Sequence, residues 1–416
     1  MYPALWHATT ALGAVHVQLN VDGPLATHWS TERGYHGLFA LKQCTKSIQS
    51  LTRLTAQKDL SEQDRIVILT TCVLFSCLSS LQGYQEQALM HIQSGLKLIR
   101  DWGLEEMYLQ QRGHPMTSML LLMFNQLDSQ ALYTRHALMI KSTPDEHDKL
   151  PLTMPLSVGS FASCLQAYAE LERLINGFSR IGLRNEGEGG SRNQQTVIQW
   201  KQVYSQALNA WDTRFSHFLA TTSEQLSENM MTLLRIRRLF ISTRFNDSSK
   251  GELGYDEFFS RFATIVDLIE KLLGPKDNVT VEKDGFPSSS SPSPQNTTHK
   301  QVNISLSIIV SDPLIFTGSR CREPSTRRRA LRLLQMYPRR EGIVNSILAA
   351  NLLEAMISFE EKSCSKMQSG SDSASTTSSD TCSTAGRWIC SKHRIVYEEF
   401  LDMSRLAQKH TQRWRK

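Results

Sequence analysis

The stretch "RCREPSTRRRALRLLQMYPRREG" at residues 320–342 holds eight arginines, no lysine and two glutamates, so its formal charge is +6. The whole chain of 416 residues has the same formal net charge of +6. The remainder of the chain is therefore neutral overall, and a broad basic surface for nucleic acid is not predicted. The segment itself has three interpretations: a nucleic-acid contact, a nuclear address, or a part of the folded scaffold.

The segment has the pattern of two helices separated by a proline. Pro324, followed by serine and threonine, is typical of a helix start, and Ala330 and Leu334 then recur on one apolar face. Pro338 ends this helix, and a second, strongly apolar helix is expected to begin near Glu341. We therefore predict a helix–proline–helix corner inside the fold, not a free basic tail.

The candidate site residues are Arg327, Arg328 and Arg329. On a helical wheel Arg327 projects close to the apolar face, whereas Arg328 and Arg329 lie on the other side. Because the planar guanidinium group suits pairing with carboxylates, we expect these arginines to be structural and to pair across helices. A phosphate or base contact and a nuclear address at the same three residues remain alternatives.

Helical periodicity extends over almost the whole chain, of which 40% is hydrophobic, enough for a substantial core. Short connections join the first three strongly periodic segments, which are therefore expected to pack antiparallel. The longest uncharged apolar run, Ile66 to Leu81, is shorter than the roughly 20 residues of a membrane-spanning helix, so we predict a buried core helix. The run "VNISLSIIV" at residues 302–310 is compatible with a strand or a helix, and we expect a helix because no other convincing strand is evident.

The predicted fold class is all-α, an irregular multi-helix domain of antiparallel helix pairs with disordered Ser/Pro-rich insertions. Its parts are an N-terminal helical part at 1–275 with a flexible loop at about 182–196, a disordered linker at 276–300, a helical part at 301–362 with the arginine-rich Pro-Arg-Arg-Glu-Gly corner, a disordered Ser/Thr tract at 363–386 and a C-terminal helix at 387–416.

Motifs for catalysis and metal binding are not evident. The sequence contains no phosphate-binding loop, dinucleotide fingerprint, zinc-protease helix or serine-hydrolase elbow. The carboxylates beside His147 define no metal geometry, and no pair among the eight cysteines has Cys-x-x-Cys spacing, which suggests free thiols in a reducing compartment. We predict no enzyme, no catalytic or cofactor-binding residue and no metal ligand, with an unrecognised helical enzyme as the alternative.

The segment Pro313 to Glu361 resembles the late part of the regulatory domain of fungal binuclear zinc-cluster transcription factors. In that family an arginine-rich helix precedes a Pro-Arg-Arg-Glu-Gly corner and a long helix that ends in paired glutamates; here the corner is 338–342. The segments 3–16, 88–103 and 124–133 resemble earlier parts of the same domain, in the same order.

The resemblance implies a nuclear transcription regulator of metabolic or secondary-metabolite genes that acts through its helical regulatory domain. The implied partners are DNA through a missing or separate module, a related regulator in a homo- or heterodimer, and the transcription machinery, with no membrane. Family members usually carry a six-cysteine zinc cluster, which this chain lacks, so zinc is expected only if an upstream cluster exists. The alternative is an interaction or ligand-sensing module that does not bind DNA and partners a full-length regulator.

Overall fold

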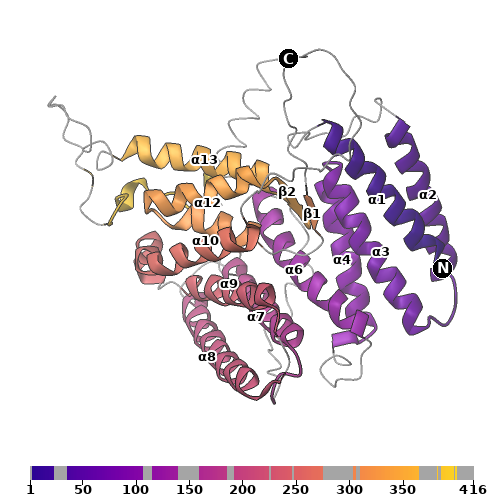
Figure 1. Ribbon diagram of the computed structural model, residues 1–416, viewed down its shortest axis with the longest axis horizontal. Coiled ribbons are helices and arrows are strands. Elements are labelled where there is room, and N and C mark those ends of the chain that lie inside the picture. The colour runs from indigo at the N-terminus through magenta and orange to yellow at the C-terminus, as the bar shows by residue number, and fades with distance from the viewer. Residues whose placement is uncertain are drawn as a thin grey trace, which may run out of the picture.

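A computed structural model describes most of the chain. The described residues are 2–22, 35–105, 115–138, 159–184, 192–223, 226–245, 248–274, 303–305, 310–364, 382, 386–397 and 399–400. Within these ranges the structure consists of packed helices and one small sheet (Figure 1). The prediction of an all-α fold is therefore confirmed.

The N-terminal helices form one group. It comprises α1 (Pro3–Asp22), α2 (Tyr35–Thr55), α3 (Glu62–Leu81), α4 (Gln85–Asp101) and α6 (Pro115–Leu138). Helix α1 packs along α2 and onto α3, and α4 and α6 also pack onto α3 (Figure 1). Because the connection between α3 and α4 is short, these two helices run as antiparallel neighbours.

Helix α3 is the central element of this group. It begins with a capping box, in which Asp64 N donates to Ser61 Oγ over 3.2 Å and Ser61 N donates to Asp64 Oδ2 over 3.1 Å. Its composition and length would suit a membrane span, but 78% of its most apolar window is buried inside the domain. The prediction of a buried core helix for Ile66 to Leu81 is confirmed.

The middle helices carry the largest hydrophobic core. They are α7 (Cys164–Arg184), α8 (Arg192–Thr221), α9 (Glu228–Thr243), the 3-10 segment η2 (Ser248–Phe258) and α10 (Phe259–Leu273). Aromatic side chains spaced along one face of α8 are buried in this core. The predicted loop at about 182–196 is helical at both ends, because α7 continues to Arg184 and α8 begins at Arg192, and residues 185–191 lie outside the described ranges.

Three helices complete the same core from the C-terminal side. They are α11 (Ser311–Arg320), α12 (Pro324–Met336) and α13 (Ser346–Ser363), which pack on one another and on α9 and α10 (Figure 1). Helix α12 begins as predicted, with Pro324 in its first turn and the Glu323 carboxylate accepting from the backbone of Ser325 and Thr326.

A small sheet joins the N-terminal and C-terminal groups. Strand β1 (Asn303–Ser305) pairs in parallel with β2 (Arg339–Glu341), which pairs antiparallel with β3 (Val344–Asn345). Figure 1 shows this sheet between α4 and α6 on one side and α12 and α13 on the other. The side chain of Ile304 packs against the core of the N-terminal group.

Two sequence predictions are corrected by this sheet. The helix expected over 302–310 is wrong at residues 303–305, because β2 supplies backbone partners that lie far away in the sequence. The second helix of the corner does not begin near Glu341 but at Ser346, because Gly342 has a positive φ of 57° and reverses the chain between β2 and β3.

The C-terminal predictions fall partly on described residues. The helix expected over 387–416 is wrong at its beginning, where residues 386–390 are not helical and η4 (Ser391–His393) is one 3-10 turn. The predicted disordered segments at 276–300 and, for the most part, 363–386 lie outside the described residues, as do His147 and residues 401–416.

Candidate functional site

The arginine-rich segment is largely buried. The side chains with the least exposure belong to Arg320 at 8%, Arg322 at 1%, Arg327 at 0% and Arg340 at 6%. Arg328 and Arg332 are the exposed arginines of α12. The segment therefore does not present its charge as one continuous basic face to solvent.

The carboxylate of Glu360, near the end of α13, lies at the centre of the buried arginines. It accepts from Arg322 Nη2 at 2.8 Å on Oε1 and from Arg327 Nη2 at 2.5 Å on Oε2. The Nε of Arg327 also donates to the carbonyl of Gly318 over 2.9 Å. Burial alone would raise the pKa of Glu360, but the charges and hydrogen bonds of Arg322 and Arg327 outweigh it and lower the pKa.

Arg322 links three parts of the fold. Besides Glu360, its guanidinium contacts Glu252 of η2, with Nη1 to Oε2 at 2.7 Å. It also donates to the carbonyl of Arg320 at 3.0 Å and to the carbonyl of Ile395 at 3.0 Å. Arg320 forms a second ion pair with Glu252. These contacts join the start of α12, η2 and the chain after η4.

The other two candidate arginines pair on the outside of the helices. Arg328 forms an ion pair with Glu361 of α13. Arg329 donates to Asp267 at 2.7 Å and to Glu270 at 2.5 Å, both on α10. These contacts support the structural interpretation of Arg327–Arg329, and the nuclear address remains a prediction.

The Pro-Arg-Arg-Glu-Gly corner is held against the N-terminal helices by Gln130 of α6. Gln130 Nε2 donates to the carbonyl of Glu341 at 2.9 Å, and its Oε1 accepts from Ile343 N at 2.9 Å. The side chain of Ser80 donates to the carbonyl of Ile343 at 3.2 Å. The Glu341 carboxylate caps α11 by accepting from Ser311 N at 2.9 Å. The corner is thus a joint between α3 and α6 of the N-terminal group and α11 of the C-terminal helices.

A second buried ion pair lies in the middle of the domain. Arg237 of α9 and Glu172 of α7 form a bidentate ion pair in which both side chains are 1% exposed. Asp312 lies near this pair, and burial raises the pKa of its carboxyl to about 6, with Arg237 opposing the rise and Glu341 adding to it. The Asp312 carboxyl therefore titrates near neutral pH.

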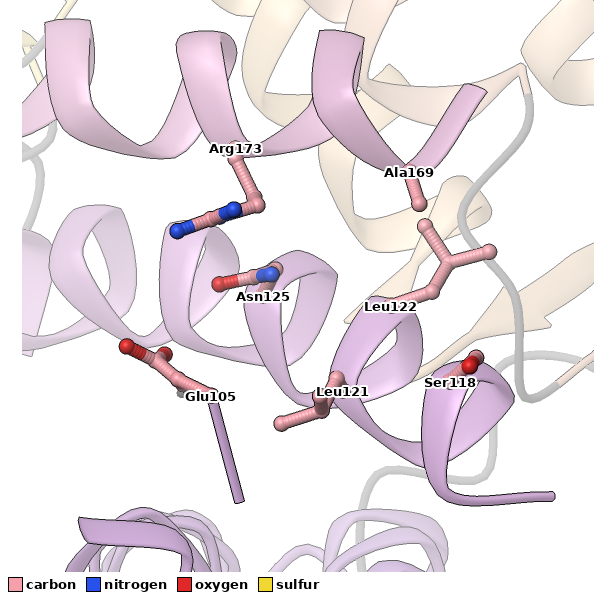
Figure 2. Close-up of a pocket in the computed structure, with 7 residues that line it drawn as sticks. All are labelled: Glu105, Ser118, Leu121, Leu122, Asn125, Ala169 and Arg173. Carbon is pink, nitrogen blue, oxygen red and sulfur yellow. The ribbon is translucent and has the colours of Figure 1, made fainter. Parts of the chain in front are cut away.

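Helices α6 and α7 leave a small pocket between them. It is lined by Glu105, Ser118, Leu121, Leu122, Asn125, Ala169 and Arg173. Figure 2 shows Arg173 reaching from α7 toward Asn125 of α6, with Glu105 on the opposite side. The cavity volume is only about 10 Å³, which is room for about one water molecule. This pocket is too small for a metabolite.

A further group of side chains brings together metal-ligating atoms that the sequence analysis did not assign. The ligand atoms of Cys364, Cys382, Cys390 and His393 all lie within 4.8 Å of one another. A search for Cys-x-x-Cys spacing misses this group, because its closest pair is Cys390-x-x-His393 and Cys364 is distant in sequence. The Cys-x-x-His spacing of Cys390 and His393 is the feature of the sequence that could have indicated this group.

The cysteines do not suit a six-cysteine zinc cluster of the family type. Cys72 and Cys77 lie inside α3, where burial raises the pKa of their thiols to about 11 and about 12. Burial likewise raises the pKa of Cys44 on α2 and of Cys321 to about 11 each. The raised pKa values favour the protonated thiols, and apart from the pair on α3 these cysteines lie on separate elements, so they do not fit a shared cluster.

Comparisons with known proteins agree with the sequence pattern. Residues 1–164 match the model of a family described as the fungal specific transcription factor domain. The chain is 25% identical over 284 residues to the aspercryptin biosynthesis cluster-specific transcription regulator atnN of Emericella nidulans, a match that covers 65% of this chain and 44% of that protein. The chain thus spans less than half the length of this relative. No solved structure matches the chain.

Proposed function

We propose that this chain, whose residues 1–164 match the model of the fungal specific transcription factor domain, is the helical regulatory domain of a fungal transcription regulator. The match agrees with the resemblance seen in the sequence. The proposed targets are metabolic or secondary-metabolite biosynthetic genes, and the proposed site of action is the nucleus. The relative, which is named as a cluster-specific transcription regulator, supports this choice of targets.

The single observation that carries the proposal is the family match at residues 1–164, which covers α1 to α6. The joint at Gln130 then ties the C-terminal helices to these matched helices. The family and the relative point to a regulator of transcription and not to an enzyme, and we assign no catalytic residue.

Contact with DNA is proposed to come from a separate module or a partner, not from the arginine segment. Buried guanidinium groups that are already bound to carboxylates, such as those of Arg322 and Arg327, are not available to phosphates. Of the two exposed arginines on α12, Arg328 already forms an ion pair with Glu361.

The test is an epitope-tagged chain expressed from its own locus, compared with a deletion strain. Chromatin immunoprecipitation should recover a limited set of promoters, and transcripts of the genes behind them should change on deletion. A chain that stays outside the nucleus and whose deletion leaves the transcriptome unchanged would refute the proposal.

A second candidate function is an interaction module that partners a full-length zinc-cluster regulator. The observation that favours it is a set of exposed apolar side chains on the two outer helices: Trp6 at 55% and Val17 at 49% on α1, and Leu38 at 62%, Leu41 at 61% and Ile48 at 53% on α2. On each helix these residues recur at helical spacing, as expected for a surface that packs on another protein.

The two functions are separated by binding experiments on purified chain. Binding to duplex DNA at low salt, where phosphate contacts are strongest, would favour direct action at promoters. Failure to bind DNA, together with co-purification of a zinc-cluster protein that is lost in a Leu38→Glu, Leu41→Glu double variant, would favour the interaction module.

A further inference from the structure

We propose that Cys364, Cys382, Cys390 and His393 form a structural zinc site that fastens the chain after α13 to the body of the domain. This site is separate from a six-cysteine cluster. It has four ligands, and it lies at the C-terminal end of the described residues.

The distances between the ligand atoms fit a tetrahedral ion. Zn–S bonds of about 2.3 Å and Zn–N bonds of about 2.0 Å place two sulfurs about 3.8 Å apart and a sulfur and a nitrogen about 3.5 Å apart. The Sγ atoms of Cys364 and Cys382 are 3.9 Å apart, and Cys382 Sγ lies 3.6 Å from His393 Nδ1. Cys390 Sγ lies 2.9 Å from the same nitrogen. This sulfur–nitrogen distance is shorter than in a tetrahedral zinc site, so it must lengthen when the ion binds.

The donor set selects the metal. Three thiolates and one imidazole are soft and borderline ligands, which favour zinc over magnesium or calcium. Four protein ligands complete a tetrahedron and leave no open position for water or substrate, which is the arrangement of a structural and not a catalytic site. A disulfide does not account for the geometry, because its sulfurs would lie about 2.05 Å apart.

Backbone hydrogen bonds of the fold bring the ligand residues together. Cys364 caps the end of α13, where its N–H donates to the carbonyl of Glu360 at 3.1 Å. Cys390 begins η4, and its carbonyl accepts from His393 N at 3.2 Å. Ile395 N donates to Glu360 Oε1 at 2.8 Å. The carboxylate that binds the arginines of α12 therefore also places η4 beside the end of α13.

A second anchor holds the same segment against η2. The guanidinium of Arg394 contacts Asp256 with both terminal nitrogens, at 2.9 Å and 2.7 Å, and its Nε donates to the carbonyl of Ile389 at 2.9 Å. Cys364, Ile389 and Cys390 form a small buried core of their own at 0% exposure. The thiols of Cys364 and Cys390 are thus positioned and shielded, whereas Cys382 and His393 are half-buried and remain partly accessible to solvent.

The first test measures the metal content of the purified full chain. Wild-type protein produced in zinc-supplemented medium should carry one equivalent of zinc, and Cys390→Ser and Cys382→Ser should each lose it. Cys44→Ser is the matched control, because this cysteine is half-buried on α2 and lies outside the cluster; it should retain the full equivalent. Wild-type protein without zinc, or zinc retained in Cys390→Ser, would overturn the proposal.

The second test does not depend on the folding of a cysteine variant. Wild-type chain, stripped of metal and reduced, should bind Co²⁺ with the visible bands of a tetrahedral site and the near-ultraviolet bands of thiolate ligation, and Zn²⁺ should displace it. His393→Cys should still bind Co²⁺ with shifted bands, and His393→Ala should bind it at least tenfold more weakly. Absence of tetrahedral bands in the wild type, or a disulfide between Cys364 and Cys382 in freshly purified protein, would refute the site.

Discussion

Arg327 and Glu360 are 33 residues apart in sequence, both are fully buried, and Arg327 Nη2 donates to Glu360 Oε2 over 2.5 Å. This pair fixes the arginine helix α12 to α13. Because the same carboxylate also accepts from Arg322, its removal would leave Arg327 without a counter-charge in a buried site and would leave Arg322 with Glu252 as its carboxylate partner. The stability of this part of the domain therefore depends on one glutamate.

Glu360→Gln is expected to reduce the free energy of unfolding by about 3 to 5 kcal/mol, the usual cost of breaking a buried ion pair from one side. Urea unfolding followed by circular dichroism measures it. The matched control is Glu361→Gln, which removes the partly exposed pair with Arg328 and should cost less than about 1 kcal/mol. Equal losses for the two variants would contradict the central role of Glu360.

The Arg328→Glu, Arg329→Glu double variant distinguishes structural arginines from a nuclear address. The new carboxylates would face Glu361, Asp267 and Glu270, so we expect a loss of roughly 1 to 2 kcal/mol in stability from like-charge contacts. Thermal unfolding of the purified chain and fluorescence microscopy of a tagged chain are the two measurements.

The control for this double variant is Arg332→Glu, a change at an exposed arginine on the same helix, which should leave the unfolding midpoint nearly unchanged. An unaltered midpoint in the double variant, accompanied by loss of nuclear accumulation, would show that the arginines act only as an address.

The carboxyl of Asp312 predicts a pH dependence of stability. Burial raises its folded pKa to about 6, above the unfolded value of about 3.9. Between these values the folded chain keeps a proton that the unfolded chain has lost, so this contribution to stability falls as the pH rises from about 4 to about 6. Asp312→Asn should remove that fall and stabilise the chain at pH 7 by on the order of 2 kcal/mol.

The difference between the unfolding free energies of wild type and Asp312→Asn, measured from pH 4 to pH 8, tests this. For Asp64→Asn, the same difference in unfolding free energy should change with pH in the opposite direction. The hydrogen bonds of Ser61 lower the pKa of Asp64, so the contribution of the Asp64 carboxylate to stability is lost as the pH falls. A flat difference curve for Asp312→Asn would contradict the raised pKa.

Gly95 on α4 is expected not to tolerate a methyl group. A Cβ there would lie 2.2 Å from Cε1 of the buried Phe124 on α6, so Gly95→Ala should cost about 1 to 3 kcal/mol through overpacking. Gly13→Ala on α1 is the control. Its Cβ would meet nothing within 4 Å, and the better helix propensity of alanine should stabilise the chain by up to about 1 kcal/mol. Urea unfolding of both variants is the measurement, and a stabilised Gly95→Ala would contradict the packing of α4 on α6.

The helical class was predictable because helix periodicity is a local property, and the cap residue Ser61 and the first-turn Pro324 mark helix starts in the sequence itself. Strand β1 was not predictable, because three residues carry no period and their partner, β2, lies more than thirty residues further along the chain. The turn at Gly342 shows the same limit: its positive φ follows from a strand pairing that is visible only in three dimensions.

The candidate site was predictable in kind but not in detail. The fork of the guanidinium group favoured pairing with carboxylates, and the paired glutamates at the end of α13 were part of the resemblance. The partner Glu252 was not foreseeable, since it reaches Arg322 from a 3-10 segment 70 residues away. The group of Cys364, Cys382, Cys390 and His393 forms because the end of α13 lies beside η4. Neither segment alone indicates this contact in the sequence.

The contacts of Gln130 and Ser80 with the Pro-Arg-Arg-Glu-Gly corner also concern how the chain folds during synthesis. The hydrogen-bond partner of Ser80, the carbonyl of Ile343, lies 263 residues further along the chain. The partner of Gln130, the carbonyl of Glu341, lies 211 residues further along. At ribosomal rates of about 5 to 20 residues per second, α3 and α6 are made roughly 10 to 50 seconds before the corner that covers them. During that interval the parts of α3 and α6 that the corner covers are open to chaperones, and the completed domain forms only when the last quarter of the chain emerges.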